Sequence, residues 1–190
     1  MNFSKVRNII KIDRFANANH FGGDLLFDKK GRLYLATGDG TIDDTVSTDV
    51  TAEDDILAPQ YLNDYRGKIL RLDTSDLKLM PEIIAFGIRS PWGVSIDSED
   101  RMFVPDCGNA TVEKVFLLND LNSGTPINLG WPIFEGSKRM IDHPLTLDDV
   151  LAPIFETTVR PGCMTGGFYF KEIESYVFSD FFGAIRLLKQ

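Results

Sequence analysis

Short apolar runs recur along the chain, and each is bounded by Gly, Asp, Asn or Pro. Residues 68 to 73 alternate apolar and polar side chains at a period of two, which is typical of a half-buried strand. Further strands are predicted over residues 25–27, 33–36, 83–88, 115–118, 152–157 and 185–188. Because no segment of a dozen residues has the 3.6-residue period of a helix, the pattern predicts an all-β fold.

The segment from residue 19 to residue 40 is expected to form a β-hairpin. Its turn begins with Asp28 and ends with Gly31, two residue types that tolerate the positive φ of a tight hairpin. Polar residues gather at the other end, where His20 precedes the first strand and Asp39 follows the second. The hairpin therefore carries candidate chemistry at one end.

This hairpin recurs. A shift of 69 positions places Asp28 on Asp97 and Arg32 on Arg101, with apolar residues in front of each Asp. A fainter third copy begins at residue 166, which gives a period of about 70 residues. We therefore expect one domain over residues 1–190, with repeats near residues 19–73, 83–118 and 152–190.

Short strands, Gly-rich turns and a repeat of this length favour a β-propeller, in which each repeat is a four-stranded sheet placed radially. The chain has room for about three such sheets, so it predicts a partial propeller. The two end sheets of an open arc keep an uncovered apolar face. We therefore expect either further blades of a longer chain or self-association.

The charge balance limits the possible partners. The chain carries 28 acidic and 20 basic side chains, a net charge of -8. Nucleic acid is excluded as a partner because phosphate backbones require clustered Lys and Arg. No apolar run approaches the roughly 18 residues that span a bilayer, and the first ten residues have no apolar signal-peptide core.

An acidic loop follows the first hairpin over residues 43 to 55. Its carboxylates belong to Asp43, Asp44, Asp49, Glu53, Asp54 and Asp55. A solvated loop is the favoured interpretation, and a calcium site is the alternative because calcium prefers several oxygen ligands. The spacing does not match an EF-hand loop.

The two cysteines, Cys107 and Cys163, have no neighbouring Cys with which to form a metal clip. Two small buried apolar side chains are the favoured interpretation. A disulfide is the alternative, and the sequence does not decide between them.

Several motifs in a fixed order identify a family resemblance. They are Asn19-His20-Phe21-Gly22-Gly23, Thr37-Gly38-Asp39-Gly40, Gly67-Lys68-Ile69-Leu70-Arg71, Arg89-Ser90-Pro91-Trp92-Gly93, Asp106-Cys107-Gly108-Asn109 and Gly130-Trp131-Pro132. In this order the chain resembles the soluble glucose/sorbosone dehydrogenase family. The resemblance implies a central part of a six-bladed β-propeller that binds pyrroloquinoline quinone and Ca2+ at one end of its axis. It also implies a small-molecule sugar substrate and a periplasmic or secreted location.

The resemblance implies roles for individual residues. His20 matches the general base that takes a proton from the anomeric hydroxyl of the sugar, which suits imidazole near pH 7. Asn19 lies beside it and is expected to orient it. Arg89 matches the arginine that contacts the anionic edge of the quinone.

The resemblance assigns four further positions. Gly108 and Asn109 match residues whose backbone carbonyls hold the calcium. Ser90 and Cys107 lie at cofactor-binding positions, where the best-known relatives carry Asn and Gln.

Other features depart from the family's pattern or favour another function. The turn at residues 178 to 183 lacks the lysine that glucose-oxidising relatives place against the quinone. Trp92 and Trp131 are interpreted as core or interblade packing residues rather than sugar platforms. The leading hypothesis is a quinone-dependent sugar dehydrogenase, and the alternative is a non-catalytic propeller module that binds a protein or glycan.

Overall fold

The computed structural model describes residues 8–12, 19–41, 56–76, 80–109, 111–158 and 162–189, and the acidic loop of residues 43 to 55 lies outside them. The described residues form fourteen strands, joined by loops and short 3-10 helices. The strands are β1 (Gly22–Phe27), β2 (Leu33–Thr37), β3 (Lys68–Leu72), β4 (Glu82–Phe86), β5 (Ser95–Ile96), β6 (Met102–Asp106), β7 (Glu113–Leu118), β8 (Ile127–Asn128), β9 (Phe134–Glu135), β10 (Lys138–Arg139), β11 (Phe155–Thr157), β12 (Met164–Phe170), β13 (Ser175–Asp180) and β14 (Ile185–Lys189). The predicted all-β class is confirmed.

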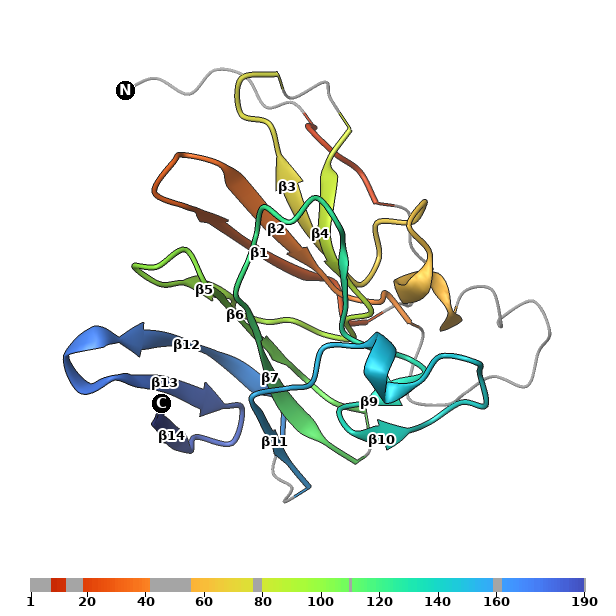
Figure 1. Ribbon diagram of the computed structural model, residues 1–190, viewed down its shortest axis with the longest axis vertical. Helices are drawn as coiled ribbons and strands as arrows, with labels where there is room; N and C mark the ends of the chain where they lie inside the picture. Colours follow the sequence, from red (N-terminus) through yellow and green to blue (C-terminus); the bar gives the residue numbers. More distant parts are fainter. Residues whose placement is uncertain are drawn as a thin grey trace.

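Three sheets lie face to face (Figure 1). The first sheet has the order β1-β2-β3-β4-β8, the second β11-β7-β6-β5 and the third β12-β13-β14. Strands β9 and β10 form a small separate pair. The second sheet lies between the other two, as consecutive blades of a propeller do.

The turns at Asp28 and Asp97 have the same construction. Asp28 Oδ1 accepts hydrogen bonds from the backbone N–H groups of Lys30 and Arg32, both at 2.9 Å. Asp97 Oδ1 accepts in the same way from the residues two and four positions later, and each carboxylate also accepts from the Nε–H of the arginine that ends its turn. One turn chemistry thus closes both hairpins.

Two apolar cores separate the sheets. The first core packs Tyr34 and Ile69 of the first sheet against Val104 and Phe116 of the second. The other core packs side chains on the opposite face of the second sheet against the third sheet, with Phe103 stacked on Tyr176 at 4.3 Å between ring centroids. The second sheet is therefore apolar on both faces, which fixes it between two neighbours.

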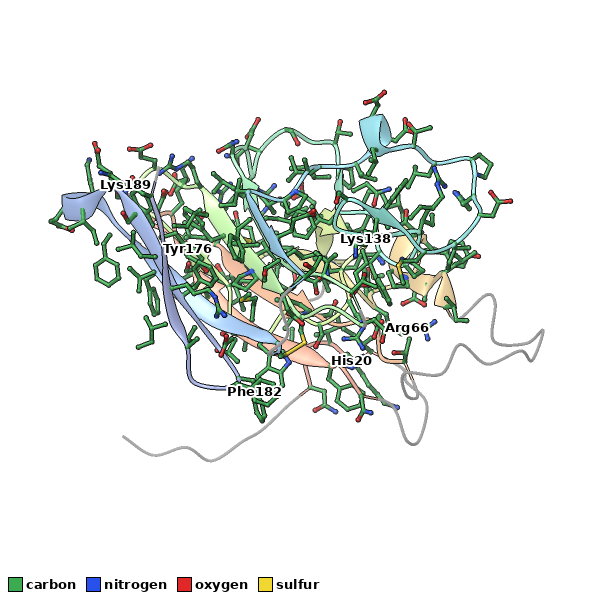
Figure 2. All side chains as sticks on the ribbon, turned by 90° about the horizontal axis from the view of Figure 1, so that it is seen from below. His20, Arg66, Lys138, Tyr176, Phe182 and Lys189 are labelled. Atoms are coloured by element: carbon green, nitrogen blue, oxygen red, sulfur yellow. A yellow bond between two sulfur atoms is a disulfide. The ribbon has the colours of Figure 1, made fainter. Side chains whose placement is uncertain are left out.

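Antiparallel pairing brings one set of loops to the same end of the sheets. These loops precede β1 and β12 and follow β2, β4, β6 and β13. Figure 2 shows His20 and Phe182 along one side of the molecule and Lys189 along the opposite side. We call the first of these the axial end, and it carries the candidate site. None of the helices in the described ranges is long and apolar enough to cross a membrane.

Candidate functional site

His20 lies in the loop before β1, at the axial end. Its backbone φ is 56°, a left-handed conformation that is uncommon for a residue other than glycine. Its ring Nδ1 is 3.2 Å from Asp39 Oδ1 and 3.2 Å from Thr41 Oγ1. The ring is therefore fixed by two side chains from the loop after β2.

A close backbone approach sets the position of His20. An added Cβ at Gly38 would lie 1.6 Å from the His20 carbonyl oxygen and 3.0 Å from that of Arg89. The Gly38 N–H also donates to the Phe21 carbonyl at 3.0 Å. Only glycine fits at position 38, where the two loops cross, and this close packing explains the first glycine of the Thr-Gly-Asp-Gly motif.

Asp39 connects the parts of the site. Its carboxylate is buried, and it accepts hydrogen bonds from the Trp131 Nε1–H at 2.8 Å and from the Thr41 hydroxyl at 3.1 Å. Its backbone N–H donates to the Arg89 carbonyl at 2.7 Å. Asp39 thus joins the His20 loop to the loop after β4.

The contact with Asp39 determines which nitrogen of the His20 ring carries the proton. A carboxylate only accepts hydrogen bonds, so Asp39 favours the tautomer of His20 that carries its proton on Nδ1. Nε2 then has the free lone pair and is the nitrogen that can take up a proton. Asn19, which was predicted to orient the base, contributes its backbone N–H to the Thr41 carbonyl at 2.7 Å.

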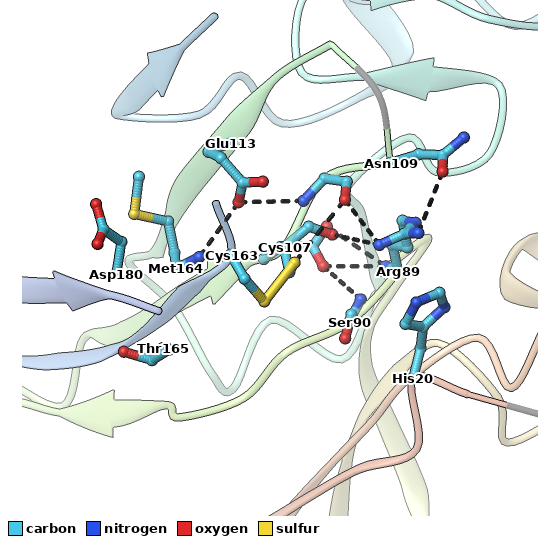
Figure 3. Close-up of a disulfide and its surroundings, with 12 residues drawn as sticks. His20, Arg89, Ser90, Cys107, Asn109, Glu113, Cys163, Met164, Thr165 and Asp180 are labelled. Carbon is cyan, nitrogen blue, oxygen red and sulfur yellow. Dashed lines mark hydrogen bonds between the residues drawn. A yellow bond between two sulfur atoms is a disulfide. The ribbon is translucent and has the colours of Figure 1, made fainter. Parts of the chain in front are cut away.

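Arg89 is buried at the same end of the sheets. Its Nη1–H donates to the Gly108 carbonyl at 2.7 Å and to the Cys107 carbonyl at 3.3 Å, and Nη2–H donates to Asn109 Oδ1 at 3.2 Å (Figure 3). The guanidinium carbon lies 5.6 Å from the centre of the Trp131 ring, a cation–π distance. Trp131 therefore contacts both Asp39 and Arg89.

A buried ion pair holds the backbone of this loop. The carboxylate of Asp106 accepts from the N–H groups of Arg89 at 3.1 Å and Ser90 at 2.7 Å. Its other oxygen lies 3.0 Å from Lys114 Nζ, and both side chains are fully buried. The loop after β4 is thus fastened to the second sheet.

Two glutamates hold the loop after β6. Glu113 accepts from the N–H groups of Gly108 and Met164, both at 3.2 Å, and burial raises the pKa of its carboxyl. Burial has the same effect on Glu135, but hydrogen bonds, led by that from the Thr111 hydroxyl, outweigh it and lower the Glu135 pKa. This loop, which supplies the acceptors for Arg89, is therefore well anchored.

Cys107 and Cys163 form a disulfide with a Cα–Cα distance of 4.4 Å (Figure 3). The favoured interpretation as two separate buried side chains is wrong. The loops before β12 and after β6 meet at the axial end, a proximity that sequence spacing does not reveal. The bond joins the third sheet to the loop that binds Arg89.

Ser90 and Trp92 have different environments. The Ser90 hydroxyl is buried and has no hydrogen-bond partner among the residues that the structure describes. Trp92 is 51% exposed and is therefore not a core residue, but its ring packs edge to face on Phe181, in the loop after β13, at 6.0 Å. Trp131, by contrast, is buried. The site therefore has exposed aromatic rings beside it.

The arrangement does not fit calcium at Gly108. That carbonyl oxygen accepts from the positively charged Arg89 side chain, and a calcium ion on it would lie against the guanidinium. Within the described ranges, no three His, Cys, Asp or Glu side chains gather as metal ligands. Calcium, which the resemblance implied, is thus not shown.

A model of the Glucose / Sorbosone dehydrogenase family matches residues 1–186. The chain belongs to this family. Among its relatives, the HIPL2 protein of Arabidopsis thaliana is 33% identical over 163 residues, which cover 70% of this chain and 21% of that protein. The aldose sugar dehydrogenase YliI of Escherichia coli (strain K12) is 27% identical over 135 residues, or 65% of this chain and 32% of that protein.

Solved structures of two sugar-oxidising proteins share the fold. The PQQ-bound aldose sugar dehydrogenase from Streptomyces coelicolor aligns with 95% of this chain and 47% of its own, at 19% identity and a TM-score of 0.68. The pyranose dehydrogenase PQQ domain from Coprinopsis cinerea aligns with 87% of this chain and 49% of its own, at 15% identity and a TM-score of 0.59. The chain thus spans about half of these structures and under a third of the two curated relatives. Its fold is part of a six-bladed β-propeller.

Proposed function

We propose that this glucose/sorbosone dehydrogenase family member oxidises a sugar with a bound quinone, pyrroloquinoline quinone, and that His20 is the base. The linked cluster of His20, Asp39 and Arg89 carries the proposal, because it combines an oriented imidazole with a buried cation at one end of the sheets. A neighbour of the same fold is named as PQQ-bound. The cluster supplies the two kinds of group that this chemistry requires.

Arg89 is proposed to hold the anionic edge of the cofactor. A guanidinium binds carboxylates through paired N–H donors. Asp106 and the carbonyls of Cys107 and Gly108 fix its backbone and side chain in advance, so little ordering remains on binding. The buried Ser90 hydroxyl is a further polar atom that a bound cofactor could satisfy. On these grounds the residues at this end of the sheets fit a quinone.

His20 is proposed to accept the proton of the sugar's anomeric hydroxyl on Nε2. Asp39 holds Nδ1–H, which leaves the Nε2 lone pair as the acceptor in the neutral ring and stabilises the imidazolium once the proton has transferred. When bound, the quinone supplies the acceptor for two electrons. The exposed rings of Trp92 and Phe181 offer apolar surface to the carbon face of a sugar ring.

Titration of the purified chain with pyrroloquinoline quinone, followed by absorbance, tests the binding part of the proposal. We expect saturable binding that weakens about 10–100-fold in Arg89→Met, since a hydrogen bond to a charged group contributes about 1.5–3 kcal/mol. Arg71→Met is the matched control, because Arg71 pairs with Glu82 outside the site. Absence of saturable binding to the unmodified chain would overturn the proposal.

The alternative function, a non-catalytic binding module, differs in one measurable way. Both functions allow a ligand at the axial end, but only the dehydrogenase reduces an electron-accepting dye when an aldose is added. Saturable quinone binding without turnover would favour the module.

A further inference from the structure

Three oxygen atoms of the loop after β6 converge on the side chain of Arg89. They are the carbonyl oxygens of Cys107 and Gly108, at 3.3 and 2.7 Å from Nη1, and Asn109 Oδ1, at 3.2 Å from Nη2. The three residues are consecutive, so the loop presents these atoms as one group, which we call the oxygen set. Carbonyl and amide oxygens are also the atoms with which proteins hold calcium.

Two carboxylates on the far side of the loop explain why these oxygens face the guanidinium. The N–H and C=O of a trans peptide group point in opposite directions. Glu113 accepts the Gly108 N–H, so the Cys107 carbonyl of the same peptide group points away from Glu113. Glu135 accepts the Asn109 N–H and turns the next carbonyl in the same way. Figure 3 shows Glu113 and the guanidinium on opposite sides of this loop.

Close packing fixes the loop in this orientation. An added Cβ at Gly108 would lie 2.6 Å from Glu135 Oε1 and 2.0 Å from the Val112 carbonyl oxygen. Position 108 therefore requires glycine, and the loop cannot shift towards the carboxylate. The oxygen set is thus oriented by the protein itself and not by the cation that it binds.

The surroundings of the oxygen set suit a guanidinium. Its planar fork lets Nη1 and Nη2 donate to neighbouring oxygens at the same time. The guanidinium carbon lies 5.6 Å from the centre of the Trp131 ring, whose face attracts a cation. Arg89 is only 4% exposed, and Asp106 accepts its backbone N–H at 3.1 Å. A calcium ion on the same oxygens would have to displace this buried side chain or lie against its positive charge.

We propose that the oxygen set is a cation site that Arg89 fills in place of a metal ion, so that the axial end holds an anionic ligand without calcium. Glu135, whose pKa is lowered, supplies negative charge on the far side of the loop and favours the cation. This inference deepens the proposed function, on which it rests only for the identity of the ligand.

Calcium-dependent melting of the quinone-free chain tests the assignment. The difference between the Tm in millimolar CaCl2 and the Tm in EGTA is measured for the unmodified chain and three variants. Arg89→Ala removes the cation and leaves the oxygens, so calcium should raise its Tm by about 2–4 °C more than that of the unmodified chain. Arg89→Lys keeps a positive charge and should match the unmodified chain. Arg71→Ala, which removes an arginine paired with Glu82 outside the site, should also match it.

Calcium bound elsewhere on the chain would shift all four proteins alike and cancels in this comparison. Equal shifts in Arg89→Ala and the unmodified chain would overturn the inference, because the oxygen set would then take no metal ion when the guanidinium is removed. A calcium-dependent rise in Tm that Arg89→Ala abolishes would also overturn it, because calcium binding would then require Arg89.

Quinone titration of the unmodified chain is a second test that needs no variant, and it decides the question if circular dichroism shows that Arg89→Ala does not fold. The Kd in EGTA and the Kd in millimolar CaCl2 should agree within about twofold, and a tenfold weakening in EGTA would overturn the inference. Absence of quinone binding in both buffers would contradict the proposed function alone, because the melting comparison contains no quinone and still decides the cation assignment.

Discussion

Asp39 is the residue on which the geometry of the site depends most. It contacts the His20 ring, receives the indole N–H of Trp131 and donates its own N–H to the carbonyl of Arg89. A single buried carboxylate therefore sets the tautomer of the His20 ring and connects His20 to Arg89.

Asp39→Ala is expected to lower kcat about 10–100-fold with little change in KM, the usual cost of removing a group that orients a reacting residue. Asp39→Asn keeps an oxygen that can accept from Nδ1–H and should therefore recover part of the lost kcat. A loss in Asp39→Ala that falls on KM with kcat unchanged would contradict the positioning role, even if the variant were less stable.

Gly38→Ala is expected to destabilise the fold by about 1–3 kcal/mol, because the added Cβ overlaps the His20 carbonyl and must displace a loop. Urea unfolding measures the change. Gly124→Ala is the control, since Gly124 has a positive φ of 71° but open space around it, and its cost should be about 1 kcal/mol. Equal costs at the two sites would contradict the close packing of the loops.

At the scale of residues, the sequence predicted which side chains lie at the site better than it predicted their hydrogen-bond partners. His20, Arg89 and the Thr-Gly-Asp-Gly motif were identified, but the role of Asp39 and the polar contact of Trp131 were not. Trp131 reaches Asp39 from 92 positions away, and periodicity carries no information about such a contact. The signal available for Asp39 was its position in the Gly-Asp-Gly motif that ends the first hairpin.

At the scale of elements, three attachments fasten the axial loops to the second sheet: the pair of Asp106 with Lys114, the Glu113 carboxylate and the disulfide. Asp106 holds the backbone of Arg89 in the loop after β4. Glu113 and the disulfide hold Gly108 and Cys107 in the loop after β6. The acceptors for Arg89 thus come from a part of the molecule with several independent anchors.

Glu113→Gln tests one anchor through pH. Because the Glu113 pKa is raised in the folded state, the folded chain keeps a proton that the unfolded chain has released, and stability falls as pH rises above the ordinary value of 4.5. Glutamine keeps an oxygen acceptor but does not titrate. The Tm advantage of Glu113→Gln should therefore grow with pH over this range, and a difference independent of pH would contradict the shift.

Loss of the disulfide tests another anchor. The bond closes a loop between residues 56 positions apart, so its removal should destabilise the chain by about 4 kcal/mol on the chain-entropy model. Dithiothreitol should lower the Tm of the unmodified chain but not that of Cys107→Ala/Cys163→Ala. Equal Tm values with and without reductant in the unmodified chain would contradict the bond.

For the elements, strand positions followed from period-two patterns and turn residues, so β2, β3 and β7 begin and end within about two residues of their predicted limits. The disulfide and the short strands β8 to β10 could not be predicted from these patterns. Each depends on loops that meet only when the sheets have assembled, and local pattern does not record that.

At the scale of the whole molecule, the repeat predicted a partial propeller with uncovered ends. In the first and third sheets, Leu25 and Leu187 are more than half exposed. What the sequence could not supply is the identity of the covering surface, because Leu25 and Leu187 have the same apolar character whether a blade of the same chain or of a second copy packs on them. The chemistry at the axial end is tested separately.

The most direct test of that chemistry is aldose-dependent dye reduction by the quinone-loaded chain, with the two histidines of the sequence as a matched pair. General base catalysis typically contributes about 10²–10⁴-fold, so His20→Asn is expected to lose activity on that scale. His143→Asn, which changes a loop side chain whose ring accepts from the Leu145 N–H, should keep the rate of the unmodified chain. Full activity in His20→Asn, or equal losses in both variants, would contradict the assignment of His20 as the base.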